Sequence, residues 1–430
     1  MTVIELPFVV TPDRFRAAFP RSGAFVLEDA TQCLMGAEPS SIVRVRRRDA
    51  RDPFGVLRSA MKELGPAKPS EASFPFPFRG GLVGYIGYEV GQLLERLPNR
   101  ERPSLELPDL AFGVHRWVLG TRENRSWLVT RDEPAPIVDR LRDARAARDD
   151  RAKAPGAAKA WMTRAEYLEK VALAKEHILS GDAFEICLTT AFDVAFHRAH
   201  AWSLFRELRA QNPAPFSAFL DLPEATLVSA SPERFLSLDE HRIAETRPIK
   251  GTRPRGATPA EDARLREDLR ASEKDRAENA MIVDLSRNDL GRVCEVGSIA
   301  APDLYAVESY ATVHQLVSTV RGTLAAERDA FDLLRAAFPP GSMTGAPKIE
   351  AMRILEHLEP IERGPYSGAL GWIDASGTMD LSVVIRSVIC AGEIARFHAG
   401  GAVTADSDPE SEYEEMLQKT RALRSALGVP

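Results

Sequence analysis

Residues 184–196 read FEICLTTAFDVAF and alternate along their whole length. One set of alternate positions holds Phe184, Ile186, Leu188, Thr190, Phe192, Val194 and Phe196. Side chains of a β-strand point to opposite faces in turn, so this pattern predicts a long strand with that set on a buried face. Glu185, Cys187 and Thr189 then lie on the other face.

The second half of the chain continues with strand and helix patterns in mixed order. Further strands are expected at 225–238, 311–320, 366–373, 380–390 and 393–405, and helices at 259–271, 274–290, 329–338, 347–358 and 409–426. Thr163 and Glu166 form a predicted capping box for one more helix, which Gly181 ends. Helices separate groups of strands with hairpin-like spacing, which predicts α/β layers on largely antiparallel sheets.

Composition excludes several classes of protein. The chain has 430 residues, of which 44% are hydrophobic, and a formal net charge of −6, which does not suit a general nucleic-acid binder. The chain contains no apolar run of about 18 residues, so no transmembrane helix is expected. The N-terminus lacks the pattern of a secretory signal. The scattered cysteines form no metal-binding motif. We expect a soluble, globular, cytosolic protein that binds neither nucleic acid nor membranes.

A charged, alanine-rich stretch at 139–160 is the candidate boundary within the chain. Such a composition is typical of a solvated helix followed by a linker. It divides an N-terminal part, 1–150, from a second part, 160–428. We expect the two parts to form one intertwined globular unit.

Two expected helices carry carboxylates on faces shared with apolar residues. Glu278 lies three residues before Met281 and four before Ile282, on the apolar face of the helix at 274–290. A carboxylate there is paired, hydrogen-bonded, protonated or bound to a metal ion. Spacing alone favours a partly exposed residue in a salt bridge.

The last helix begins with Asp408 as cap and Pro409 in the first turn. Glu412, Glu415 and Lys419 share one stripe of it. That spacing suits a cation held by carboxylates beside an ammonium group for an anionic ligand, and Mg²⁺ accepts one or two carboxylates. Ordinary surface pairing at i,i+3 and i,i+4 is the alternative, and spacing alone favours it.

Other segments could bind anions or donate protons. A Gly-rich turn that enters a helix at Pro347 is expected within 341–355, and a second Gly-rich turn at 398–407. Either could hold a carboxylate through backbone N–H groups. Glu233 follows a strand in SASPERF. Arg386 lies within the apolar strand LSVVIRSVIC, where an arginine is costly unless it meets an anion. His314 lies in another strand and is more simply a packed residue.

The segment 246–256, TRPIKGTRPRG, places Lys250 beside Gly251. A basic surface loop is the simplest interpretation. Taken together, however, the convergent glutamates, the cations and the Gly-rich turns suggest a small, multiply anionic substrate held through magnesium.

These segments, in this order, resemble the chorismate-utilising enzymes. The matching pieces are SPERF, RPIKGT, KDRAENAMIVDLSRNDLGRV, LVST, GSMTGAPK, GALGW, VVIRS and GGAVTADSDPESEYEEMLQK, which cover 160–425 densely. The N-terminal third matches loosely, through GGLVGYIGYE. The resemblance implies an α+β fold, an α/β/β/α sandwich of two large, orthogonally packed antiparallel sheets, with chorismate bound between them.

The resemblance also implies roles for individual residues. Glu278 and Glu415 match direct Mg²⁺ ligands, and Glu412 supports them. The positions that hold substrate are matched by Arg386, Lys419, Gly251, Thr252, Gly400 and Gly401. Glu233 matches the acid that protonates the departing C4 hydroxyl group.

Lys250 separates branches of the family. Members that make anthranilate resemble PIAGT here, whereas those that make aminodeoxychorismate resemble PIKGT. In the second branch the lysine attacks C2 of chorismate while C4 loses water, and ammonia then adds at C4 and expels it. This chemistry calls for a desolvated lysine with a lowered pKa. Glu185 stands where isochorismate-forming members have a water-activating lysine, which disfavours water addition.

One position departs from the family pattern. Much of the family has histidine immediately before the leucine of LVS, and this chain has Gln315 there and His314 one residue earlier. Alternation turns the two side chains to opposite faces, so Gln315 is expected to supply a hydrogen bond to the substrate and His314 is a secondary candidate.

The ammonia source is expected to be another protein. No cysteine lies in a G-x-C-x-G nucleophile elbow, and the resemblance implies a class I glutamine amidotransferase subunit that delivers ammonia. The expected activity is that of a transferase that aminates chorismate. The anthranilate-forming activity is the alternative within the family, and a non-catalytic chorismate-binding partner subunit is the alternative outside enzymes.

Overall fold

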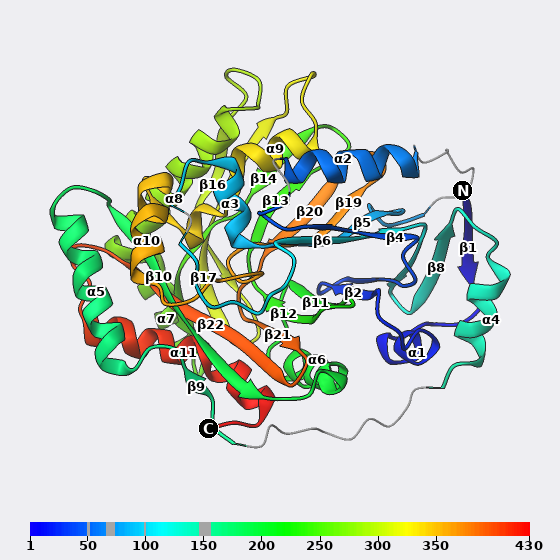
Figure 1. Cartoon of the computed structure of the whole chain (residues 1–430), viewed down its shortest axis with the longest axis horizontal. Coiled ribbons are helices and arrows are strands. Elements are labelled where there is room, and N and C mark those ends of the chain that lie inside the picture. Colours follow the sequence, from blue (N-terminus) through cyan, green and yellow to red (C-terminus); the bar gives the residue numbers. More distant parts are fainter. Residues whose placement is uncertain (50–51, 66–73, 99, 146–155) are drawn as a thin grey trace.

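A computed structural model describes residues 1–49, 52–65, 74–98, 100–145 and 156–430. In this part of the chain the strands form two large sheets, and all pairings between strands are antiparallel (Figure 1).

The larger sheet has 12 strands among the described residues. Its order is β1 (Thr2–Leu6), β8 (Arg125–Thr130), β7 (Trp117–Arg122), β3 (Gln32–Gly36), β2 (Ala24–Glu28), β11 (Phe216–Asp221), β12 (Thr226–Ser231), β21 (Ser387–Ala391), β22 (Ile394–Val403), β10 (Glu185–Ala195) and β18 (Gly345–Ala346), with β9 (Lys159–Ala160) paired to β10.

The smaller sheet has ten strands in the same described ranges. Its order is β15 (Ile249–Pro254), β17 (Val313–Thr323), β14 (Ile243–Thr246), β13 (Arg234–Leu238), β20 (Met379–Val383), β19 (Ala369–Asp374), β5 (Gly81–Ile86), β6 (Leu110–His115) and β4 (Ser41–Val45), with β16 (Ala300–Ser309) paired to β17.

Three apolar clusters define the layers. One joins the larger sheet to α1 (Pro12–Ala18), α4 (Ala135–Asp143), α5 (Arg164–Leu179), α6 (Ala201–Gln211), α10 (Lys348–Leu358) and α11 (Pro409–Leu427). A second joins the smaller sheet to α2 (Pro53–Leu64), α3 (Gly91–Leu94), α8 (Glu273–Gly291) and α9 (Ala330–Ala337). The third, which includes Phe25, Phe78 and Trp372, draws side chains from both sheets. The helix, sheet, sheet, helix order of the predicted sandwich is confirmed.

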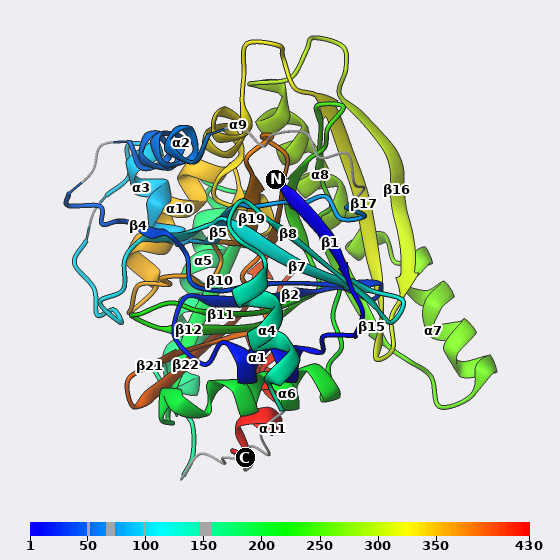
Figure 2. The ribbon, with the colours of Figure 1, turned by 90° about the vertical axis from the view of Figure 1, so that its right-hand side faces the viewer.

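The two views show how the helices cover the sheets. In Figure 1, α2 and α9 lie along the top, whereas α6 and α11 lie along the bottom. Figure 2 shows α7 (Pro259–Ala271) projecting on the side of β15 and β16. None of the helices in the described part of the chain is long and apolar enough to cross a membrane.

Strand β10 confirms the predicted alternation, with two differences. Both of its faces are buried, because one packs on helices and the other faces the smaller sheet. Phe184 lies just before the first strand residue and is 69% exposed, so it does not belong to the buried face. The sequence pattern could not show where strand pairing begins.

The predicted strand at 380–390 is two strands in different sheets. Strand β20 belongs to the smaller sheet and β21 to the larger, and the chain crosses between them at 384–386. Arg386 lies at this crossing, with φ at +51°, rather than inside a strand. Both strands are buried, so their sequences join into one apolar run that hides the break.

The predicted Gly-rich turn at 398–407 is mostly strand, since β22 continues to Val403. A Cβ on Gly400 would come within 2.0 Å of the carbonyl oxygen of Leu188 on β10. Glycine is needed here for close approach of two strands and not for a turn.

Strands from the first 130 residues are built into both sheets. Strand β2 pairs with β11 in the larger sheet, and β5 pairs with β19 in the smaller one. Residues 146–155 of the predicted boundary lie outside the described residues, and α4 ends before them at Asp143.

The predicted helix caps are confirmed. Thr163 and Glu166 form the capping box of α5. The side chain of Asp408 accepts a hydrogen bond from the backbone N–H of Ser411 at the start of α11, and Gly428 ends that helix in a left-handed conformation.

Candidate active site

Lys250 lies on a bulged strand. Strand β15 pairs with β17, and the register shifts between Ile249 and Thr252. Gly251 between them has φ at +85°, which favours glycine. A bulge redirects the side chain beside it. The glycine after the lysine is thus part of what aims Lys250, which is 8% exposed and does not lie on a surface loop.

Lys250 reaches across to the other sheet. Its Nζ donates to Oε1 of Glu185 on β10 at 2.5 Å, and Glu185 is fully buried. Burial works to lower the pKa of Lys250, but the Glu185 and Glu278 carboxylates outweigh burial and raise that pKa. The predicted lowered pKa is therefore wrong for the protein without substrate, because the sequence did not show that a carboxylate would face the lysine.

Glu233 follows β12 and is 5% exposed. Burial raises the pKa of Glu233 to about 7, although contacts from Ser342 and the charge of Lys250 oppose the rise. A carboxyl group with such a pKa carries a proton near neutral pH, as a general acid must. Ser342 lies in the predicted Gly-rich segment, within a short 3-10 turn before β18 and α10.

Glu278 on α8 faces both Lys250 and Lys274. Burial raises the pKa of Glu278 to about 7, and the Lys250 and Lys274 charges oppose the rise. The Lys274 Nζ is 3.9 Å from Oε1 of Glu278. Glu278 is therefore a largely buried carboxylate with a distant ammonium as its ion-pair partner, and not a simple surface salt bridge.

Glu412 and Glu415 on α11 face the same region. The hydroxyl of Ser407 donates to Oε1 of Glu412 at 2.7 Å, and burial raises the pKa of that carboxyl group. The charge of Lys419 lowers the pKa of Glu415, with smaller contributions from Lys274 and Lys250. The carboxylates of α8 and α11 thus share the fields of the same lysines.

The carboxylates fit a magnesium site of low protein coordination. No set of three or more His, Cys, Asp or Glu side chains is close enough to hold a metal ion within the described ranges. Mg²⁺ keeps several water molecules and takes one or two carboxylates, so Glu278 and Glu415 have the chemistry of suitable donors.

Lys419 connects α11 to β22. Its Nζ donates to the carbonyl oxygen of Gly400 at 2.8 Å and lies 2.8 Å from Oε1 of Glu415. A Cβ on Gly401 would lie 2.6 Å from Oε2 of Glu412, so these glycines let the carboxylates approach the strand. Beyond Phe397, β22 pairs with β10 but not with β21, which leaves one backbone edge without a strand partner in the described part of the sheet.

Arg386 is a partly buried cation with no counterion in the part of the chain that the structure describes. No hydrogen bond or ion pair joins its guanidinium group to any described residue, and burial lowers its pKa. Tyr366, whose charge would raise that pKa, stacks on His398 with ring centroids 4.8 Å apart. A guanidinium group in such a place calls for an anionic ligand.

His314 and Gln315 separate as the alternation predicts. The ring nitrogens of His314 contact Ser309 and Asp262, so His314 belongs to the packing of α7 and does not join the cluster around Lys250. Gln315 pairs with Thr252 on β15 and is 4% exposed. Its side-chain oxygen has no hydrogen-bond partner among the described residues.

Sequence reasoning missed Lys274 and Ser342 as members of the cluster. Lys274 lies four residues before Glu278, a spacing that indicates a helical pair and could have identified it. Ser342 carries no spacing signal, because its contact with Glu233 depends on the tertiary fold.

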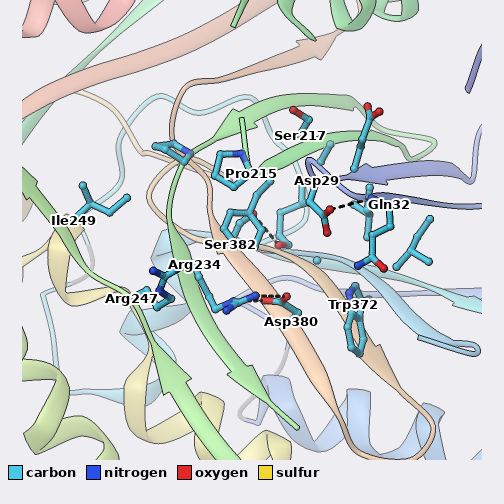
Figure 3. Close-up of a pocket in the computed structure, with 18 of the residues that line it drawn as sticks. Asp29, Gln32, Pro215, Ser217, Arg234, Arg247, Ile249, Trp372, Asp380 and Ser382 are labelled. Carbon is cyan, nitrogen blue, oxygen red and sulfur yellow. Dashed lines mark hydrogen bonds and ion pairs between the residues drawn. The ribbon is translucent and has the colours of Figure 1, made fainter. Parts of the chain in front are cut away.

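Another cavity lies elsewhere between the sheets (Figure 3). It has a volume of about 210 Å³ and none of the predicted catalytic, substrate-binding or metal-binding residues lines it. Figure 3 shows Arg234 directed at Asp380, and the two form an ion pair at 3.0 Å. Ile249 lines this cavity, so strand alternation turns Lys250 away from it.

Known proteins resemble this chain along almost its whole length. A family model described as chorismate binding enzyme matches residues 16–425. Aminodeoxychorismate synthase component 1 of Klebsiella aerogenes is 44% identical over 81% of this chain and 77% of its own length. Aminodeoxychorismate synthase of Streptomyces pristinaespiralis is 43% identical over 88% of this chain, which spans 55% of that relative.

A solved structure agrees with the fold. Anthranilate synthase component I from Streptococcus pneumoniae superposes with a TM-score of 0.81 at 28% identity, covering 93% of this chain and 92% of its own. The sequence and structure matches cover both sheets and the elements that carry the polar residues around Lys250. This chain belongs to the family of chorismate binding enzymes.

Proposed function

We propose that this chain converts chorismate and ammonia into 4-amino-4-deoxychorismate, using Lys250 as a covalent nucleophile. The observation that carries the proposal is a buried lysine, aimed by a glycine bulge, that faces a buried acid and a carboxylate pair. Relatives named aminodeoxychorismate synthase support this reaction.

In this reaction Glu233 supplies a proton to the C4 hydroxyl group. Hydroxide is a poor leaving group, so the C4–O bond breaks readily only when a proton is donated to it. The raised pKa of Glu233, about 7, keeps that proton available near neutral pH. Lys250 attacks C2 as water leaves, and ammonia then adds at C4 and expels the lysine.

Glu278 and Glu415 would hold a magnesium ion, with Glu412 in support. When bound, the ion would neutralise a substrate carboxylate and orient the ring. Arg386 and Lys419 would bind carboxylate oxygens of chorismate, and backbone donors near Gly400 and Gly401 would add to them. Gly251, Thr252 and Gln315 would border the ring.

A separate class I glutamine amidotransferase subunit would supply the ammonia. Relatives named component 1 imply a second component. None of the four cysteine contexts, TQCLM, EICLT, RVCEV and VICAG, has the nucleophile-elbow pattern of a glutaminase.

Formation of anthranilate is the second candidate function. The superposition on anthranilate synthase component I supports it. Lys250 is the residue that argues against it, because it adds a nucleophile that direct amination of C2 does not need.

Trapping of the covalent intermediate tests the proposal. We would mix the protein with chorismate and Mg²⁺ without ammonia, quench with acid and measure the intact mass and the modified peptide. A chorismate adduct, less one water, on Lys250 is expected, and Lys250→Ala should form none while it still binds chorismate. The exposed Lys62 on α2 gives a control, Lys62→Ala, which should form the adduct normally. An adduct in Lys250→Ala, or none in the native chain, would contradict the proposal.

A further inference from the structure

Glu185 is the group in direct contact with the nucleophile of the proposed reaction. It lies at the start of β10 and is fully buried, with 0% exposure. Its Oε1 accepts from Nζ of Lys250 at 2.5 Å, and its Oε2 has no hydrogen-bond partner among the described residues. Nothing in the proposed reaction has yet used this carboxylate.

Lys250 cannot attack carbon while it carries its proton, because an ammonium group has no free electron pair. Burial works to lower the pKa of Lys250, but Glu185 and Glu278 raise it, so the resting protein holds the proton. The proton must therefore move to a base before the bond to C2 forms.

The groups facing Lys250 differ in their fitness as that base. Glu233 is the acid of the reaction, and Glu278 is assigned to the metal ion. Burial raises the pKa of the Cys187 thiol, so it stays protonated and accepts nothing. Glu185 alone among the described residues accepts a hydrogen bond from Nζ.

We propose that Glu185 is a catalytic base that takes the proton of Lys250 and later returns it. This inference rests on the proposed function. Burial favours the transfer, since a neutral amine beside a neutral carboxylic acid needs less solvation than an ion pair.

The steps balance in atoms and charge. One proton moves from Nζ to Glu185, the Nζ electron pair forms the bond to C2, both ring double bonds shift, and the C4–O bond breaks as Glu233 protonates the leaving oxygen. Ammonia then forms the C4–N bond, the double bonds shift back, and the C2–N bond breaks. Glu185 returns its proton to the released Nζ, and the new ammonium at C4 returns one to Glu233.

The test compares Glu185→Gln and Glu185→Asp with the native chain in single-turnover adduct formation without ammonia, followed by rapid quench and intact mass. At neutral pH we expect the rate for Gln to fall about 100-fold or more, as for loss of a general base, while chorismate affinity changes little. The rate of adduct formation by Glu185→Gln should recover as pH rises, because solvent then removes the proton of Lys250. Asp keeps a carboxylate farther from Nζ, so its rate should fall less than that of Gln.

Opposite outcomes overturn the proposal clearly. If Glu185 only holds Lys250 in its charged form, Glu185→Gln frees the amine and the rate stays the same or rises. If the Gln variant does not fold, Glu185→Ala takes its place, and an unchanged or faster rate in Glu185→Ala overturns the role equally. Absence of the adduct in the native chain would instead overturn the proposed function, and the role of Glu185 with it.

A matched control lies on the same strand. Asp193 pairs with Arg396 at 2.6 Å, far along β10 from Glu185, and has no contact with the cluster around Lys250. Asp193→Asn should leave the adduct rate unchanged, with melting temperatures recorded for every variant. A fall in this control equal to that of Glu185→Gln would show a general effect of disturbing β10 and would overturn the specific role.

Discussion

Glu233 illustrates how a buried acid that is proposed to donate a proton in the reaction also affects stability. Its pKa rises from a usual 4.5 to about 7 on folding, so the folded chain binds its proton more tightly than the unfolded chain does. The stability from this group is complete below about pH 4.5 and is lost as pH rises through about 7. The full loss is roughly 3 kcal/mol.

Glu233→Gln cannot ionise and escapes this loss. We expect the unfolding free energy of the variant, relative to the native chain, to be higher at pH 8 than at pH 5 by up to about 3 kcal/mol. Urea denaturation at both pH values measures it. A difference in unfolding free energy that does not change with pH would mean that the pKa of Glu233 is not raised. The assignment of Glu233 as the acid would then lose its physical support.

Arg386 should contribute to binding rather than to folding. Because its guanidinium group has no counterion among the described residues, Arg386→Gln should weaken chorismate binding about ten- to a hundredfold without lowering the melting temperature. Calorimetric titration and thermal unfolding give the two quantities. Arg234 is the matched contrast, because it is paired with Asp380 and Glu245, and Arg234→Gln should lower stability instead. Unchanged chorismate affinity in Arg386→Gln would remove this residue from the site.

At the scale of single residues, the sequence predicts which side chains share a face when they are close together in the chain. Glu412, Glu415 and Lys419 share one face of α11 because they are three, four and seven residues apart. Strand alternation separates His314 from Gln315 in the sequence, but the contact of His314 with Asp262 joins positions far apart in the chain and could not be predicted. The raised pKa of Lys250 likewise depends on Glu185, on another sheet.

Strand β15 shows how an element positions the proposed nucleophile, Lys250. A Cβ on Gly251 would lie 2.8 Å from Cγ of Asp275, and the residue has φ at +85°. Gly251→Ala should therefore cost about 1–3 kcal/mol of stability and also misdirect Lys250, lowering adduct formation. Thermal unfolding and the adduct rate measure the two effects.

Gly297 supplies the control for that substitution. It has φ at +82° with nothing within 4 Å of the added Cβ. Gly297→Ala should show backbone strain alone, with normal adduct formation. Equal activity of the two variants would mean that the bulge does not aim Lys250.

Elements were predictable where their ends carry local signals. The caps of α5 and α11 mark those helices in the sequence, because a capping residue acts within four positions. The junction at Arg386 was missed, since two buried strands that follow each other read as one apolar run. The sequence predicts a turn at the β22 glycines, because glycine is common both in turns and where two strands lie close together.

At the scale of the whole molecule, the N-terminal strands complete both sheets. Separated from residues 1–145, the remainder would expose the β11 edge and much of the cluster between the sheets. We expect residues 156–430 alone to aggregate or remain unfolded, and co-expression with residues 1–145 to restore a folded complex. Circular dichroism measures the folding of the fragment and gel filtration its assembly state. A stable, monomeric 156–430 fragment would contradict this expectation.

The architecture of the N-terminal third could not be predicted residue by residue. Its strands are five or six residues long, and they find partners far away in sequence, such as β5 with β19. Short strands carry weak local signals, and their pairing depends on tertiary contacts. The second part was predictable through its dense family motifs.

Product identification is the most direct test of whether this chain aminates C4 of chorismate. The purified chain would be incubated with chorismate, Mg²⁺ and ammonium, with and without EDTA, and the products separated and identified by mass spectrometry. We expect 4-amino-4-deoxychorismate, formed only when the metal ion is available and converted to 4-aminobenzoate by an added aminodeoxychorismate lyase. Anthranilate as the product, or no consumption of chorismate, would contradict it.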